Sequence, residues 1–94
     1  MDKEAQKITF ELLCEWKDNP PTYRVYVDNE LMQEREYVWN NEQQYVVEMI
    51  PVHLDSGEHS LNFENLNEET AEFVMRNFRI DGHDVDLEDG LFVI

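Results

Sequence analysis

The chain contains little cysteine, glycine, proline or positive charge, and each shortage excludes a class of protein. Its single cysteine, Cys14, cannot form an intramolecular disulfide, so the fold is expected to need no oxidising compartment. Three glycines and three prolines are too few for a repetitive or linker-like chain. No apolar run approaches the roughly 20 residues of a membrane-spanning helix, and residues 1–7 lack the apolar stretch of a secretory signal.

Positive charge is the scarcest property: seven Lys and Arg stand against 22 Asp and Glu, which gives a net charge of −15. Phosphate backbones and anionic lipids attract cations, so this balance argues against direct binding to nucleic acid or to a membrane. Three interpretations remain: a solubilising surface, a surface that attracts a basic partner or metal ions, and a mimic of nucleic acid.

The chain does have enough apolar material for one core. Apolar residues make up 41% of the sequence and aromatic residues 12%, which is too much for a disordered chain despite the charge. The length fits a single small domain spanning residues 1–94, of which residues 1–6 are expected to be flexible.

Apolar and polar side chains alternate along most of the chain, which is typical of half-buried β-strands. The clearest example is residues 8–16, where one face would carry Ile8, Phe10, Leu12, Cys14 and Trp16. A second strand at 22–27 would bury Tyr23, Val25 and Val27. Further strands are expected at 31–39, 44–54, 59–66, 72–81 and 91–94.

Turn residues separate these strands at short intervals. Asp28-Asn29-Glu30 and Asp55-Ser56-Gly57-Glu58 favour tight turns, 67–70 is expected to be an acidic loop, and 82–90 an acidic connection. Pro51 inside a strand favours an edge position, a bulge or a corner. The pattern predicts an all-β fold, a two-sheet antiparallel β-sandwich of jelly-roll type with about seven to eight short strands.

No arrangement of residues predicts catalysis. The three histidines, His53, His59 and His83, lie in no hydrolase or metalloprotease motif. Cys14 falls on the expected buried face, where cysteine acts as a small hydrophobe. The 22 carboxylates make any pair unremarkable, so no enzyme is expected. The acidic segment 81–90 does not match the EF-hand spacing for calcium, because the required glycine would fall at Asp89.

Aromatic side chains offer one candidate binding surface. Tyr37 and Trp39 share a face of their expected strand, and Tyr26 and Tyr45 lie on neighbouring strands. Such a platform could stack on sugar rings or anchor a protein interface. The alternative is that these rings cap the core of the sandwich, with their polar tips in water.

Two families resemble this sequence. The runs Ile8-Thr9-Phe10-Glu11-Leu12, Cys14-Glu15-Trp16, 20–31 and Glu36-Tyr37-Val38-Trp39-Asn40 look like small uncharacterised proteins of contractile-tailed marine cyanophages, and Ser60-Leu61-Asn62-Phe63 and 89–94 continue the likeness. That resemblance implies a phage gene product, acting in the host cytoplasm or the virion.

More distantly, Val25-Tyr26-Val27-Asp28-Asn29 and Phe78-Arg79-Ile80-Asp81-Gly82 are similar to strand signatures of calcium-dependent, xylan-binding-type carbohydrate modules. That resemblance implies a jelly-roll fold and a calcium loop before the late strand. The corresponding segment 64–72 has no glycine and no Asp, so no metal or other cofactor is expected. Were calcium bound there, the candidate ligands would be Asn65, Asn67, Glu69 and Glu72.

The sequence therefore predicts a non-catalytic, phage-type β-sandwich that serves as a protein-interaction or virion accessory module. Its partner would be a protein, either a basic host protein or a second copy of the chain. Two alternatives stay open: an acidic nucleic-acid mimic that inhibits a host protein, and a calcium-dependent carbohydrate-binding module.

The net charge of −15 predicts that salt stabilises the folded chain. Like charges repel in the compact state, and raising the ionic strength from about 0.01 M to about 1 M shortens the Debye length from roughly 30 Å to roughly 3 Å. The melting temperature should therefore rise with NaCl, by about 4–8 °C for each kcal/mol of repulsion removed. A melting temperature indifferent to NaCl in calorimetry would mean that the charges lie too far apart to matter.

Overall fold

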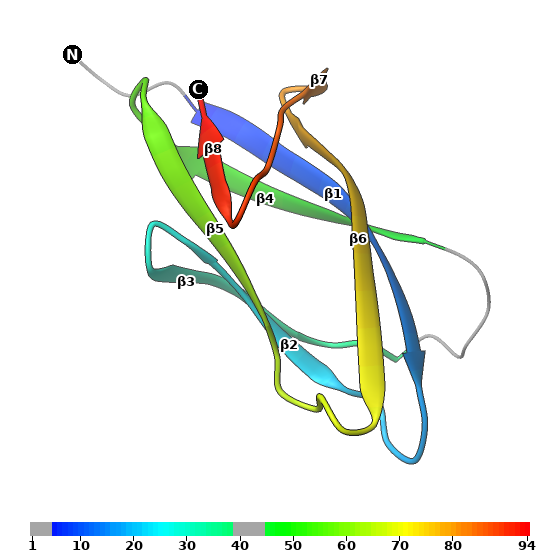
Figure 1. Cartoon of the computed structure of the whole chain (residues 1–94). Coiled ribbons are helices and arrows are strands. Elements are labelled where there is room, and N and C mark those ends of the chain that lie inside the picture. The colour runs from blue at the N-terminus through cyan, green and yellow to red at the C-terminus, as the bar shows by residue number, and fades with distance from the viewer. Residues whose placement is uncertain (1–4, 39–44) are drawn as a thin grey trace.

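The computed structural model describes residues 5–38 and 45–94, and its regular elements are all β-strands. Four strands form one antiparallel sheet in the order β4-β1-β6-β7, and four form a second sheet in the order β3-β2-β5-β8 (Figure 1). The strands are β1 (Ala5–Trp16), β2 (Thr22–Val27), β3 (Glu30–Glu36), β4 (Val46–His53), β5 (Glu58–Asn65), β6 (Ala71–Ile80), β7 (His83–Asp84) and β8 (Leu91–Val93). The predicted two-sheet sandwich is confirmed. Among the described residues, no helix has the length and apolarity that a membrane crossing requires.

The core lies where the inward faces of the two sheets meet. Ile8, Phe10, Leu12 and Cys14 of β1 are each at most 1% exposed, as the alternation predicts. Burial raises the pKa of the Cys14 thiol to about 11, so this cysteine packs as an apolar side chain. One end of the core is aromatic, with Tyr23, Phe63 and Phe73 in mutual contact at ring-centroid distances of 5.0–5.3 Å.

Two bulges change which residues face inward. In β6, Phe73 and Met75 contact the core, but so do Phe78 and Ile80, whose positions have the opposite parity. The shift occurs opposite Thr9 and Glu11, at Asn77, whose φ of 55° is left-handed. In β3, the pairing of Val25 with Gln33 and of Tyr26 with Leu31 leaves one extra residue, Met32.

Some strand boundaries differ from those expected. Ala5 and Gln6 belong to β1 rather than to a flexible terminus, because the side-chain amide of Gln6 both donates to and accepts from the Leu54 backbone, at 2.9 Å each. The third strand ends at Glu36, so Tyr37 follows it, and Trp39 lies outside the described residues. Pro51 lies in β4 at the edge of its sheet, which is the first of the three placements that the sequence left open, an edge position, a bulge or a corner.

A buried carboxyl group links the two sheets along one side of the sandwich. Glu48 of β4 is 1% exposed and points inward, where it accepts a hydrogen bond from the hydroxyl of Tyr23 on β2. Arg35 of β3 donates to the same oxygen at 2.7 Å, and Gln33 donates to the other oxygen at 3.4 Å. Burial, followed by the bond to Glu48, raises the pKa of Tyr23, so its hydroxyl remains a donor at neutral pH.

Replacing Tyr23 by Phe should lower the free energy of unfolding by about 1–3 kcal/mol, because the buried Glu48 carboxyl loses a donor that water cannot replace. The control is Tyr26→Phe, since the Tyr26 hydroxyl contacts Glu64 at 3.4 Å on an exposed face and should matter by no more than about 0.5 kcal/mol. Urea denaturation of both variants makes the comparison. Equal costs would mean that the Glu48 network does not depend on Tyr23.

Candidate functional site: an acidic groove beside β8

Two Asp-Gly turns shape the C-terminal quarter of the chain. Asp81 and Gly82 have φ of 51° and 83°, and Asp89 and Gly90 have φ of 52° and 79°. Left-handed pairs of this kind make tight reversals, which is why Asp-Gly is favoured there. Gly90 has a second reason to be glycine, because a Cβ would lie 3.1 Å from the carbonyl oxygen of Leu61. The chain thus leaves β6, forms β7, crosses over and returns as β8.

Residues 85–90 connect β7 to β8, and we call them the crossing segment. The crossing segment and β8 form the two arms of a fork. The arms are joined near Gly90, where Glu88 and Leu91 exchange backbone hydrogen bonds of 3.0 and 2.8 Å. Further along, the first arm is held to the other sheet by the bond from the Val85 amide to the Phe78 carbonyl, at 3.1 Å. The second arm, β8, stays paired with β5, and just beyond them Ile94 and Gly57 exchange two backbone bonds. The arms therefore diverge, and a groove opens between them.

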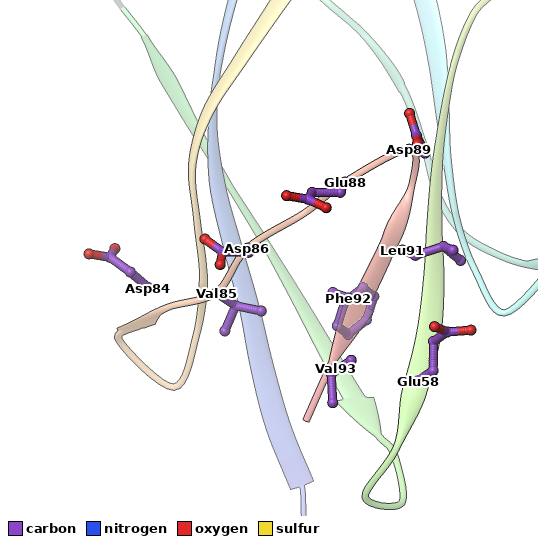
Figure 2. A pocket seen from close by; sticks show the side chains of 9 residues that line it. All are labelled: Glu58, Asp84, Val85, Asp86, Glu88, Asp89, Leu91, Phe92 and Val93. Atoms are coloured by element: carbon purple, nitrogen blue, oxygen red, sulfur yellow. The ribbon is translucent and has the colours of Figure 1, made fainter.

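The groove has a volume of about 590 Å³, which lies in the size range of ligand sites, about 300–1,000 Å³. Its apolar part consists of Val85, Leu91, Phe92 and Val93. Its rim carries five carboxylates, Glu58, Asp84, Asp86, Glu88 and Asp89. Figure 2 places Asp84 on β7, Asp86, Glu88 and Asp89 along the segment that follows it, and Glu58 on the far side of β8, so negative charge flanks the apolar strand. We call these nine residues the acidic groove.

The charge of the acidic groove is open to solvent and largely uncompensated. All five carboxylates are exposed. Asp84 accepts from Arg79 at 2.8 Å, whereas the other four make no ion pair with any residue that the structure describes. No three acidic, histidine or cysteine side chains within residues 5–38 and 45–94 converge closely enough to hold a metal ion. Such spread charge attracts an extended cation better than a single ion.

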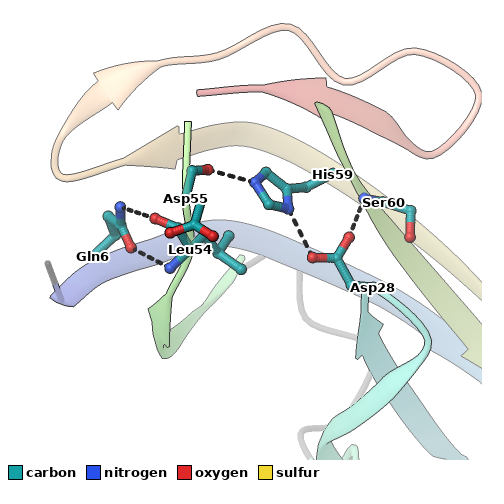
Figure 3. A network of polar contacts seen from close by, with 6 residues as sticks. All are labelled: Gln6, Asp28, Leu54, Asp55, His59 and Ser60. Atoms are coloured by element: carbon teal, nitrogen blue, oxygen red, sulfur yellow. Dashed lines mark hydrogen bonds and ion pairs between the residues drawn. The ribbon is translucent and has the colours of Figure 1, made fainter. Parts of the chain in front are cut away.

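His59 anchors β5, the strand that pairs with β8, and we call its set of contacts the histidine clamp. His59 of β5 approaches the Asp55 carbonyl through Nε2 and the Asp28 carboxylate through Nδ1, each at 2.7 Å (Figure 3). Asp28 also accepts from the Ser60 amide at 3.0 Å. The bond to Asp55, and after it the contact with Asp28, raises the pKa of His59 despite partial burial. The ring lies 5.8 Å from that of Phe92, so the clamp supports the floor of the acidic groove.

The aromatic residues proposed as a platform do not share one exposed face. Tyr37 is 1% exposed and meets Phe73 edge to face at 5.7 Å, so it belongs to the core and offers no stacking surface. Tyr26 lies on β2 and reaches Glu64, whereas the Tyr45 ring lies under the Arg76 guanidinium at 3.5 Å, against the other sheet. Trp39 lies outside the described residues.

The candidate calcium ligands are engaged in closing their own turn. The Asn65 side chain donates to the Ala71 carbonyl and accepts from the Asn67 amide, both at 2.8 Å. The Asn67 side-chain oxygen accepts from the Thr22 amide at 2.9 Å. Glu69 and Glu72 are exposed. The side-chain oxygens of Asn65 and Asn67 therefore both already accept hydrogen bonds from backbone amides.

The sequence predicted that residues 82–90 form an acidic connection, but alternation alone did not predict that this connection lines a groove. The available signal was the pair of Asp-Gly dipeptides, 81–82 and 89–90, with Val85 and Leu87 spaced two apart between them. Both of these apolar residues pack against the core and hold the crossing segment in place.

No family model matches the chain, and comparisons with curated proteins and with solved structures give no match. The geometry and charge of the acidic groove are therefore the basis for any functional proposal.

The His59 clamp predicts a stability that depends on pH. Because the folded pKa lies above the ordinary value of 6.5, the stabilisation is fully present below pH 6.5 and is lost as the pH rises through the folded pKa. The difference in free energy of unfolding between the wild type and His59→Gln should therefore be larger at about pH 6 than at about pH 8.5. His83→Gln, at an exposed position of β7, is the control. Equal differences at both pH values in urea titrations would contradict the clamp.

Proposed function

We propose that the chain is a non-catalytic interaction module that binds a basic protein through the acidic groove. The observation that supports this best is the flanking of an apolar edge strand by five exposed carboxylates, of which only Asp84 is paired with a described cation. A net charge of −15 extends the same attraction over the whole surface and favours rapid encounter with a cationic partner. Apolar contact with β8 would then add specificity to charge.

The two alternative functions have less support from the described residues. A carbohydrate module would use an aromatic face, and Tyr37 is buried. A nucleic-acid mimic would need rows of carboxylates spaced like phosphates, and on the outer face of the second sheet Arg24 stands between Glu34 and Glu64, at 2.5 and 3.5 Å. A cation between two acids weakens the imitation of a phosphate row. The resemblance to phage proteins would make the basic partner a host or virion protein.

Neutralising the acidic groove should weaken binding more than removing the same charge elsewhere. The groove variant combines Asp86→Asn, Glu88→Gln and Asp89→Asn, and the last of these keeps a side chain that tolerates a left-handed φ. Its matched control combines Glu30→Gln, Glu36→Gln and Glu69→Gln, all exposed and outside the groove. Binding to a linear decalysine, measured by calorimetry at about 50 mM salt, should fall about tenfold in the groove variant and less than about twofold in the control.

Two results would overturn this proposal. One is equal loss in the two variants, which would assign the attraction to net charge without a defined site. The other is undetectable binding of decalysine by the wild type at low salt. Unchanged urea denaturation midpoints would confirm that neither variant has altered the fold.

A further inference from the structure

We infer that the partner enters the acidic groove as an extended segment of alternating apolar and Lys or Arg residues, which pairs as an added strand with the open edge of β8. This mode of binding rests on the function proposed above and specifies its geometry. Three features of the fork support the inference. Among the residues that the structure describes, no strand lies beside the free edge of β8. The two faces of that edge carry side chains of two kinds, and the charge around it is negative.

The open edge is centred on Val93. In an antiparallel pair, every second residue bonds to its partner strand, and the residues between point their N–H and C=O away from it. Phe92 of β8 lies opposite His59 of β5, and Ile94, the residue after β8, pairs with Gly57, the residue before β5, so the backbone groups of Phe92 and Ile94 point toward that neighbouring segment. Val93 falls between them, and its backbone groups therefore face outward, where β8 ends the sheet order. Leu91 also faces outward, but Glu88 already bonds both of its backbone groups.

The two faces of this edge favour different side chains on the added strand. Phe92 points inward and is only 2% exposed, whereas Val85 on the opposite arm is half-buried, so the inward residues of an added strand would meet Val85 at the margin of the core. The other residues would lie on the outer face beside Val93, which is 64% exposed and pairs across the ladder with Glu58. A Lys or Arg there can cover Val93 with its stem and reach Glu58 with its charge. The alternation follows from this arrangement.

Charge selects the occupant. A second copy of the chain would bring its own Glu58, Asp84, Asp86, Glu88 and Asp89 against the same set, so pairing of two β8 edges is opposed by repulsion between carboxylates. A cationic segment of another protein meets no such opposition. Strand addition of this kind takes affinity from backbone hydrogen bonds and specificity from alternate side chains.

Two peptides of equal composition test the mode of binding. The first is acetyl-Lys-Val-Lys-Val-Lys-Val-Lys-amide, and the second is its isomer acetyl-Lys-Lys-Lys-Lys-Val-Val-Val-amide. The alternating peptide should bind the wild-type chain about tenfold more tightly than the isomer, because only the alternating sequence places its two kinds of side chain on opposite faces of a strand. Equal affinities would overturn strand addition.

Substitution at Val93 tests the backbone bond directly. Val93→Pro removes the outward N–H while sparing the groups that bond to β5, and Val93→Ala keeps the N–H and shortens the side chain. The proline variant should reduce the affinity of the alternating peptide to that of the isomer, a loss of about tenfold, and the alanine variant should change it by less than about threefold. Equal losses in both variants would contradict a backbone bond.

Hydrogen exchange tests the same backbone bond in the wild-type chain, so its result does not depend on whether a substitution alters the fold. The alternating peptide should slow exchange of the Val93 amide by about tenfold or more and leave the Leu91 amide, already bonded to Glu88, unchanged. Unchanged exchange at Val93 in a saturated complex would rule out strand addition. If the groove variant with Asp86→Asn, Glu88→Gln and Asp89→Asn still loses affinity in that case, the proposed function stands without the added strand. If neither peptide binds and decalysine does not bind either, both the added strand and the proposed function are ruled out.

Discussion

The carboxyl group of Glu48 joins strands from both sheets and so fixes how one side of the sandwich closes. It stands on β4, yet its hydrogen-bond donors come from β2 and β3 of the other sheet. A charge placed inside a core destabilises the fold unless it is paired and hydrogen-bonded, so the network favours the arrangement in which β4 faces β2 and β3. The opposite side is closed differently, by the segment that crosses from β7 to β8, and that is the side on which the acidic groove lies.

The sheet edges are protected unequally. On β4, Pro51 and the inward Glu48 disfavour pairing with another chain, although Val47 and Met49 are exposed there. On β3, three glutamates and a bulge do the same. The three residues of β8 include neither a charge nor a proline. Its edge is instead surrounded by the carboxylates of the acidic groove, which oppose pairing with another acidic strand such as that of a second copy.

The sequence allowed the fold class to be predicted, because a period of two over residues 8–16 and 22–27 leaves little choice of structure. It did not allow the inward face of β6 to be predicted, since the bulge at Asn77 reverses the parity between Met75 and Phe78, and one Asn carries that information. For Tyr37 the sequence left two placements open, an exposed platform and the core; the ring lies in the core, because β3 ends at Glu36 and its alternation does not extend to Tyr37. Glu48 looked like one acid among 22, because only the meeting of the two sheets gives it its partners.

Under the proposed function, the charge of the acidic groove has opposite effects on folding and on binding. The five carboxylates repel one another across the fork, so they destabilise the free chain, and screening by salt relieves them. The same screening weakens their attraction for a cationic partner. A partner that binds only the folded chain stabilises it by mass action and at the same time removes the repulsion. Replacing these acids by neutral residues is therefore expected to stabilise the free protein and, under the proposed function, to weaken its binding. Trades of this kind between stability and activity are common at functional sites.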